Sequence, residues 1–374
     1  MNLVASSPEG LENCLAKEII ELGGTKIKIS KRFISFCCDE AAMYRIHFYS
    51  RIAFRFFREV ARFKCVDKVS LYDGVQSSFN WLEWLPVQKN FCVYVTGRSS
   101  FLRHSHFTAL QVKNAIIDLQ KLQLGSRSSI SLDDPYLVIN LHLYNDEAVI
   151  SLQTTLESLH KRGYRSAMGN APIKENIAAG LIKLTKWDNK KPLIDLMCGS
   201  GTFLLEGVAM ALNIPIKLQD NYLFENWQDF DREIFLIEKE KLSKRNISPC
   251  HDLRLIGCDI DSNVLSHARF NIENAGFTDF IELKNLDSSK LIVHDQPGII
   301  LCNPPYGKKL GKEKDLIFLY EQIGQSLKRN FSGWEFWLLS GNSSLTKYLR
   351  MKASLKIPVS NGGLDCRWIK YQIR

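Results

Sequence analysis

The sequence of 374 residues predicts an α/β protein: a doubly wound, parallel sheet in the C-terminal half and a mixed α+β region before it. Three observations predict this class. From residue 192 onward, short apolar segments alternate with segments of helical period, as in sheets built from βαβ units. Residues 192–202 read as a strand that ends in a glycine turn and passes directly into a helix. Residues 1–155 instead hold two smaller sets of helices and strands.

The composition favours a polyanionic partner and argues against a membrane. Lys and Arg number 49 against 40 Asp and Glu, a net charge of +9, and residues 45–104 alone carry ten basic against four acidic side chains. The ten cysteines include no C-x-x-C pair and no Cys/His cluster with zinc spacing, so we expect no metal. With neither a leader pattern nor an apolar run near 18 residues, we expect no membrane span and a reducing, cytoplasmic location.

Residues 1–45 are expected to form a small α/β unit. Ser7 is placed to cap a helix with Pro8 at its first position, and Gly23 and Gly24 end that helix. Two strands at 26–29 and 33–36 follow.

Residues 46–155 read as a second unit in which basic residues alternate with aromatic ones. Strands are expected at 91–95, 136–143 and 147–152, with a helix at 107–122. The aromatic side chains are either core or platforms for stacked bases, and periodicity favours the core without deciding the matter. The arginines are expected to be exposed and to contact phosphates; they are Arg51, Arg55, Arg58, Arg62, Arg98 and Arg103.

Residues 156–191 form the joint between the halves. The basic loop 158–165 contains Lys161, Arg162 and Arg165, and it either borders the functional site and holds a nucleic-acid backbone or is a solvated linker. A helix is expected to open at 171–176 and to run to about Trp187.

Residues 192–202 carry the first functional motif. Gly199 and Gly201 let the backbone turn tightly and approach a ligand closely, although such a turn is often only a turn. A dinucleotide fingerprint would need glycine at position 204, which is Leu204, and a P-loop would need G-K-[ST]. The remaining expectation is S-adenosylmethionine, held by Asp195, Cys198, Gly199, Ser200, Gly201 and Thr202.

Acidic residues end the next two expected strands. Asp259, followed by Ile260, ends strand 253–258, where the rule for open α/β sheets places a ligand and where a carboxylate suits two ribose hydroxyls. Asp287 follows strand 280–284 and either accepts from the adenine amino group or is a solvated turn residue. An insert at 214–250, aromatic and then rich in Lys and Glu, is expected to cover part of the sheet or narrow the cleft.

The second motif is Asn303-Pro304-Pro305-Tyr306, which follows an apolar strand at 298–302. Neither proline can donate to a sheet, so the chain must leave it here. A rigid turn is the simpler interpretation, but an Asn-Pro-Pro-Tyr loop at a strand end is a highly specific signal. It resembles the active-site loop of methyltransferases that modify an exocyclic amine of a nucleic-acid base. Asn303 and the Pro304 carbonyl would accept the two N–H groups, and Tyr306 would stack on a flipped base.

With these residues in place, the chain resembles the bacterial ribosomal large-subunit RNA guanine-N2 methyltransferases of the THUMP-domain class, almost end to end. The resemblance rests on Arg103-His104-Ser105, His160–Arg165, Ala171–Asn176, Met197–Thr202, Asn303–Gly307 and Gly363–Cys366. It implies a ferredoxin-like unit (1–45), a THUMP RNA-binding domain (46–155), a linker (156–191) and a Rossmann-like class I methyltransferase domain (192–374). Leu196 stands where such proteins commonly have proline, a change that should leave the turn intact.

The resemblance also implies roles for single residues. Pro172 and Lys174 would lie near the methionine end of S-adenosylmethionine, and the RNA would be held by Arg98, Arg103, His104, Lys161, Arg162 and Arg165. In some bacteria a second methyltransferase that makes 7-methylguanine is fused to this half; we expect that activity to be absent here.

The sequence therefore predicts methyl transfer from S-adenosylmethionine to guanine N2 in 23S rRNA, by a monomer acting on rRNA or an assembling large subunit. Three alternatives stay open. The substrate base could be guanine in tRNA or adenine N6 in RNA, because both bases present an exocyclic amine. A non-catalytic RNA-binding assembly factor is the third, and the intact Asn303 and Tyr306 argue against it.

Overall fold

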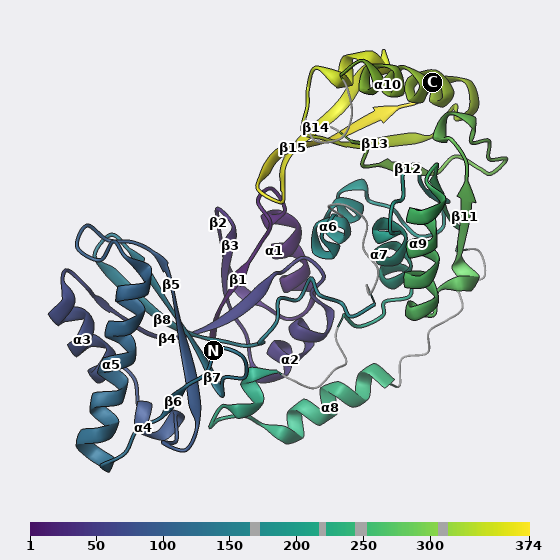
Figure 1. Ribbon diagram of the computed structural model, residues 1–374. Coiled ribbons are helices and arrows are strands. Elements are labelled where there is room, and N and C mark those ends of the chain that lie inside the picture. The colour runs from purple at the N-terminus through teal and green to yellow at the C-terminus, as the bar shows by residue number, and fades with distance from the viewer. Residues whose placement is uncertain (165–172, 217–221, 244–252, 306–312) are drawn as a thin grey trace.

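The computed structural model describes residues 1–164, 173–216, 222–243, 253–305 and 313–374 (Figure 1). Two sheets organise these residues. An eight-stranded sheet in the N-terminal half has the order β2-β3-β1-β4-β8-β7-β5-β6, and a seven-stranded sheet in the C-terminal half has the order β11-β10-β9-β12-β13-β15-β14. The expected α/β class, with an α+β region first, is confirmed.

The first unit contains β1 (Asn2–Ser6), α1 (Glu12–Glu21), β2 (Thr25–Ser30), β3 (Phe33–Cys37) and α2 (Glu40–Tyr49). Both expected strands are present. The helix starts at Glu12 and not at Pro8, because residues 8–11 close a turn in which Leu11 N–H donates to the Pro8 carbonyl at 3.1 Å. The Glu12 carboxylate then accepts from the backbone N–H groups of Gly10 and Arg32 and ties this turn to the β2–β3 hairpin.

The second unit contains β4 (Arg55–Lys64), α3 (Lys68–Ser77), α4 (Trp81–Trp84), β5 (Asn90–Gly97), α5 (Ser105–Leu124), β6 (Ser129–Ile130), β7 (Leu137–Tyr144) and β8 (Glu147–Gln153). Strand β4 pairs with β1 on one side and with β8 on the other. The two N-terminal units therefore share one continuous sheet, and the boundary expected at residue 45 falls inside α2. Phe56 and Trp81 are fully buried, which supports the core interpretation for those aromatic side chains.

The C-terminal sheet follows α6 (Glu175–Thr185). Its elements in chain order are β9 (Leu193–Asp195), α7 (Thr202–Ala211), β10 (Leu255–Asp259), α9 (Ser262–Ala275), η2 (Thr278–Phe280), β11 (Ile281–Asn285), η3 (Ser288–Lys290), β12 (Ile299–Cys302), α10 (Glu313–Asn330), β13 (Glu335–Ser340), η4 (Leu345–Leu349), β14 (Ala353–Asn361) and β15 (Leu364–Gln372). Strands β9 to β13 are parallel, while β14 and β15 form an antiparallel edge. The chain reverses its direction of strand addition between β9 and β12, and such a switch point places ligands at the carboxyl ends of the strands.

The insert holds η1 (Leu223–Asn226) and α8 (Arg232–Ser243), and the expectation that it covers the parallel sheet or narrows the cleft is wrong for these residues. They pack against the N-terminal half, as α8 beside α2 in Figure 1 shows. The ring of Tyr44 on α2 lies 5.3 Å from that of Phe224 and 5.3 Å from that of Phe235. The physical reason is that α2 presents aromatic side chains that need apolar partners, and the insert supplies them.

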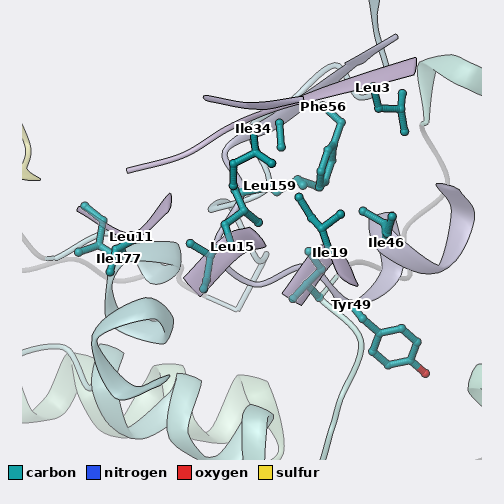
Figure 2. Close-up of a cluster of buried hydrophobic side chains, with 14 of the residues drawn as sticks. Leu3, Leu11, Leu15, Ile19, Ile34, Ile46, Tyr49, Phe56, Leu159 and Ile177 are labelled. Carbon is teal, nitrogen blue, oxygen red and sulfur yellow. The ribbon is translucent and has the colours of Figure 1, made fainter. Parts of the chain in front are cut away.

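A single hydrophobic core joins the first unit to the C-terminal half. Leu11, which precedes α1, Leu15 of α1, Leu159 of the joint and Ile177 of α6 belong to one buried cluster (Figure 2). The contact between α1 and α6 is close, since a Cβ added at Gly180 would lie 2.5 Å from Leu11 Cδ1. The two halves therefore pack directly on each other through shared core residues.

Candidate active site

The glycine turn after β9 has the geometry that its sequence predicts. Gly199 and Gly201 adopt positive φ angles of 53° and 83°, and Gly201 caps α7. The Cys198 N–H donates to the Cys258 carbonyl at 2.9 Å, which holds the turn against β10. A Cβ at Gly199 would meet no heavy atom of the described residues within 4 Å, so there is open space on this side of the turn. That space suits a ligand that approaches the backbone closely.

Asp259 at the end of β10 lies against this turn. Its Oδ2 accepts from the Gly199 N–H at 3.0 Å and its Oδ1 from the Asp261 N–H at 3.0 Å. These two bonds fix the carboxylate while leaving further lone pairs for a ligand. The next residue, Ile260, is 68% exposed, and its apolar surface beside a fixed carboxylate suits a nucleoside, with the carboxylate on the ribose and the side chain on the base.

Asp195 ends β9 one strand away and is only 1% exposed. Burial is the main reason that its pKa is raised to about 8, and the nearby Asp259 carboxylate also raises this pKa. The Met197 N–H, which donates to Oδ1, lowers the pKa in part. A positive charge brought to this strand end would favour the ionised form. A cationic ligand group such as a sulfonium or an ammonium therefore complements this position.

The other residues of the turn are buried. Ser200, Thr202 and Cys198 are each at most 5% exposed, and burial raises the pKa of the Cys198 thiol well above its usual range. The Ser200 Oγ has no hydrogen-bond partner among the described residues. Cys198 therefore acts through its backbone and its packing, because a thiol with a raised pKa is inert.

Asp287 lies at the same edge of the sheet, just beyond β11. Its Oδ1 accepts from the Ser289 N–H at 2.8 Å and caps η3, and the preceding Leu286 N–H donates to the Asp259 carbonyl at 3.2 Å. Asp287 is thus placed beside the Asp259 loop, and both interpretations of its role stay open.

Asn303 follows β12, in the strand that pairs directly with β9. The register Leu301 with Asp195 brings the Asn303 loop to the same edge as the glycine turn. The Asn303 Oδ1 is buried and has no hydrogen-bond partner among the described residues. A buried acceptor without a donor costs about 1–3 kcal/mol, so this oxygen is set to receive a donor from a ligand. Pro304 and Pro305 are described with it, whereas Tyr306 lies outside the described residues.

The residues expected to bind RNA fall into separate groups. Arg98, Arg103 and His104 are exposed on the segment between β5 and α5. Beside this segment, β5 and α5 border a groove of about 440 Å³ with exposed Tyr94 and Leu132 on its rim. Lys161 is exposed on the joint and pairs with Glu157 at 3.0 Å.

Arg162 corrects the sequence prediction. Its side chain is only 3% exposed and its Nε lies 3.3 Å from Glu206 Oε1 on α7. Its Nη2 donates to the Arg51 carbonyl and its Nη1 to the Leu159 carbonyl. All three guanidinium nitrogens donate inside the protein and the side chain is buried, so we assign Arg162 to the packing between the halves and not to phosphate binding.

The remaining residues predicted to bind the cofactor or RNA are Lys174, Pro172 and Arg165, and no described contact links them to the glycine turn. Lys174 is exposed, with its Nζ 5.0 Å from the centre of the Phe54 ring. Pro172 and Arg165 lie outside the described residues.

The arginines of β4 and of the residues before it are also less available for phosphate contacts than expected. Arg58 binds Asp229 through both terminal nitrogens at 2.6 and 2.8 Å, and Arg62 pairs with Glu59 and Glu147. Arg55 donates to the Leu156 carbonyl, and Arg51 is buried beside Glu206. Arg51, Arg55 and Arg58 are therefore directed into the protein, whereas Arg62 pairs with carboxylates at its surface. Arg98 and Arg103 face solvent, as do Lys64, Lys68 and Lys89.

Sequence reasoning assigned no role to Glu206 or Tyr164 and wrongly expected Arg51 to be exposed, whereas these three side chains meet in this buried junction. Glu206 is 0% exposed and accepts from the Tyr164 hydroxyl at 2.7 Å. The available signal was a single carboxylate within the apolar run Phe203–Ala209, since a buried charge implies a partner.

In the described ranges, no group of three or more His, Cys, Asp or Glu side chains lies where it could hold a metal ion. Of the helices the structure describes, none combines the length and the apolar content that crossing a bilayer requires.

Known proteins of similar sequence cover nearly all of the chain. A protein of Synechocystis sp., named provisionally as an RNA methyltransferase, is 38% identical over 99% of this chain and 96% of its own length. The ribosomal RNA large subunit methyltransferase K/L of Aliivibrio fischeri is 37% identical over 99% of this chain. The chain spans about half the length of that relative, 53%.

Solved structures agree over the whole chain. A possible methylase from Clostridium difficile 630 has a TM-score of 0.91 at 29% identity and covers 100% of this chain and 98% of its own. A second solved structure is a putative methyltransferase in complex with SAH, the demethylated form of S-adenosylmethionine. It has a TM-score of 0.90 at 26% identity, and the match covers 100% of this chain and 98% of the other. This likeness supports S-adenosylmethionine as the cofactor for the turn and the Asp259 loop.

Three family models match in sequence order. An RlmL ferredoxin-like domain matches residues 2–57, a THUMP domain residues 69–153, and an RMKL-like methyltransferase domain residues 162–370. The last of these covers more than half of the chain and contains both the glycine turn and the Asn303 loop. The chain therefore belongs to the RMKL-like methyltransferase family, with an RlmL-type ferredoxin-like domain and a THUMP domain before its class I catalytic domain.

Proposed function

We propose that this protein is an S-adenosylmethionine-dependent RNA methyltransferase that modifies the exocyclic N2 of a guanine in large-subunit rRNA. The observation that carries the proposal is the buried, unpartnered Asn303 Oδ1 at the edge that also holds the glycine turn. The THUMP match and the names of the relatives from Synechocystis and Aliivibrio support RNA, and the K/L relative supports the large subunit.

The protein must promote attack by the exocyclic amine of a purine, which is a poor nucleophile. When bound, S-adenosylmethionine supplies an electrophilic methyl group, whereas the lone pair of a purine amine is delocalised into its ring. The Asn303 Oδ1 and the Pro304 carbonyl would each accept one N–H of that amine, which favours the pyramidal form and the positive charge that grows in the transition state. Tyr306 would stack on the flipped base. Holding the amine in line with the methyl group would lower the entropic cost of bringing the two reactants together.

The cofactor would lie across the carboxyl ends of β9, β10 and β11. The Gly199–Gly201 turn offers the close backbone approach, the fixed Asp259 suits the ribose hydroxyls, and Ile260 suits the adenine face. Asp287 would accept from the adenine amino group. Pro172 and Lys174 are proposed for the methionine end.

The RNA would be held at some distance from the chemistry. Exposed Arg98, Arg103 and His104 beside the β5–α5 groove are proposed to bind phosphates, with Lys161 and Arg165 closer to the joint. We propose that the protein acts as a monomer.

The decisive experiment is methyl transfer from labelled S-adenosylmethionine to total rRNA and, separately, total tRNA from cells that lack this protein, followed by nucleoside analysis. Label in N2-methylguanosine of large-subunit RNA is the expected result. Label in tRNA would keep the chemistry and change the substrate. No transfer to either RNA, with cofactor binding intact, would favour a non-catalytic assembly factor.

Adenine N6 is the second candidate for the base. It is favoured by the likeness to the crystal structure of a predicted N6-adenine-specific DNA methylase from Listeria monocytogenes, which has a TM-score of 0.87 at 26% identity. An acceptor pair at Asn303 and Pro304 fits either amine. The nucleoside analysis separates the two, because N6-methyladenosine and N2-methylguanosine are different products.

A further inference from the structure

Helix α7 starts at the glycine turn, and its only buried carboxylate among the described residues, Glu206, is held by three side chains from outside the helix. Tyr164 donates its hydroxyl to Glu206 Oε1 at 2.7 Å, and Arg162 Nε lies 3.3 Å from the same oxygen. Arg51 Nη1 lies 3.7 Å from Oε2. Burial and the neighbouring Glu206 raise the pKa of Tyr164 well above its usual value, which keeps the hydroxyl a donor.

The same helix is held at a second point. Arg51 Nη2 donates to the Ala209 carbonyl at 2.8 Å and to the Ile214 carbonyl, at and just beyond the C-terminal end of α7. A guanidinium suits this end because the C-terminal end of a helix carries partial negative charge, and the Ala209 carbonyl, which also accepts from the Ile214 N–H at 2.9 Å, has a second lone pair. Arg51 thus joins the middle of α7 to its end, from a position in the ferredoxin-like domain.

The segment that carries Arg51 is itself fixed. Glu18 on α1 accepts from the Ser50 hydroxyl at 2.9 Å, from the Ile52 N–H at 3.2 Å and from Lys183 Nζ on α6 at 3.2 Å. Asn176 Nδ2, also on α6, donates to the Ile52 carbonyl at 3.0 Å. Residues 50–52 therefore cannot shift without breaking bonds to two helices, and Arg51 is a firm support for α7.

We infer that Arg51, Arg162 and Tyr164 are positioning residues for the cofactor: through Glu206 they hold α7, and the fixed helix holds the Gly199–Gly201 turn in its binding geometry. None of the three is placed in contact with the cofactor. The inference rests on the proposed function only in taking this turn as the cofactor site. It gives the ferredoxin-like domain a part in cofactor affinity, beyond any part in RNA binding.

The test is the affinity of the full chain for S-adenosylhomocysteine, measured by calorimetry without RNA. Tyr164→Phe removes one hydroxyl and keeps the ring, so the fold should survive. We expect its dissociation constant to rise by about three- to tenfold, a part of what one hydrogen bond to a charged acceptor contributes. Arg162→Met, which removes the charge but keeps the apolar stem, should weaken binding more than Arg162→Lys.

Tyr72→Phe is the matched control, because Tyr72 also donates its hydroxyl to a carboxylate, Asp118 at 3.0 Å, but on the THUMP helices α3 and α5. It should leave the affinity unchanged. Unchanged affinity in folded Tyr164→Phe and Arg162→Met, even with a lowered melting temperature, would reduce the junction to a structural role and overturn the inference. If the wild-type chain itself failed to bind S-adenosylhomocysteine, the proposed function would fail first.

Discussion

At the end of β12 the Asn303 side chain presents a buried oxygen that no described residue satisfies. If this oxygen accepts an N–H of the target amine, Asn303→Ala should lower the turnover number by about 10²–10³. Binding of S-adenosylhomocysteine should stay near the wild-type value, because the glycine turn and Asp259 are untouched. Turnover on rRNA and calorimetry measure the two effects.

Asn342→Ala is a suitable control for Asn303→Ala. Asn342 also follows a parallel strand, β13, but its Oδ1 already accepts from the Ser344 N–H at 3.0 Å. Its replacement should leave turnover largely intact. Wild-type turnover in Asn303→Ala would contradict the proposed mechanism.

Asp195 gives a prediction about pH. Its pKa rises from 3.8 in a free side chain to about 8 in the folded protein, chiefly through burial. The folded state therefore binds a proton that the unfolded state releases, so the stabilising contribution is complete below pH 3.8 and is lost as the pH rises toward 8. In the ligand-free protein, thermal unfolding measured from pH 5 to 9 should show a steeper loss of stability in the wild type than in Asp195→Asn. Parallel curves would show that Asp195 is ionised throughout.

Among the elements, the insert adds contacts to strand β4 through Trp227 and Asp229. Arg58 on β4 lies 5.1 Å from the ring centres of both Trp84 and Trp227 while binding Asp229. Arg58→Ala should lower the free energy of unfolding by about 1–2 kcal/mol, since the guanidinium is mostly buried and loses both stacking and a bidentate pair. Denaturant unfolding measures this loss.

Arg62 lies on the same strand and provides the comparison. Its ion pairs with Glu59 and Glu147 are half exposed and do not reach the insert. Arg62→Ala should therefore cost less than about 1 kcal/mol. Equal losses in the two variants would mean that the insert gains little from Arg58.

Some elements of the fold could be predicted from the sequence and others could not. The strands near 26–37, the α5 helix and the β9–α7 crossover were predictable because their periodicity and their glycines are local signals. The placement of the insert was not predictable, because the partner of its aromatic residues, Tyr44, lies about 180 residues earlier in the chain. The prediction that Arg162 binds phosphate was wrong for the same reason. Its partner Glu206 lies 44 residues later in the chain, and the sequence of a basic loop does not show whether its side chains are buried or solvated.

The position of the candidate site's backbone could be predicted from the sequence. The glycine turn, Asp259 and Asn303 follow strand ends, and parallel strands bring such ends to one edge of the sheet. The burial of the Asn303 oxygen and of Asp195 depends on packing from several elements, and no local pattern reports it.

For the whole molecule, RNA binding should depend on few arginines. Because Arg51 and Arg58 are paired inside the protein and Arg62 is paired with two surface carboxylates, Arg98 and Arg103 are expected to carry much of the phosphate contact. Replacing either with alanine should weaken rRNA binding and reduce the slope of log affinity against log salt by about 1. Arg162→Met should leave that slope unchanged. A flat salt response of the wild type would remove the phosphate argument.

The shared strand β4 affects how the N-terminal half opens. Phe57 pairs with Val4 on one side and with Gln153 on the other, so each unit borders the same strand. Releasing β4 breaks both ladders at once. Slowly exchanging amides of β1 and β8 should therefore report one common opening free energy in hydrogen exchange, and the ferredoxin-like and THUMP domains would behave as a single cooperative unit.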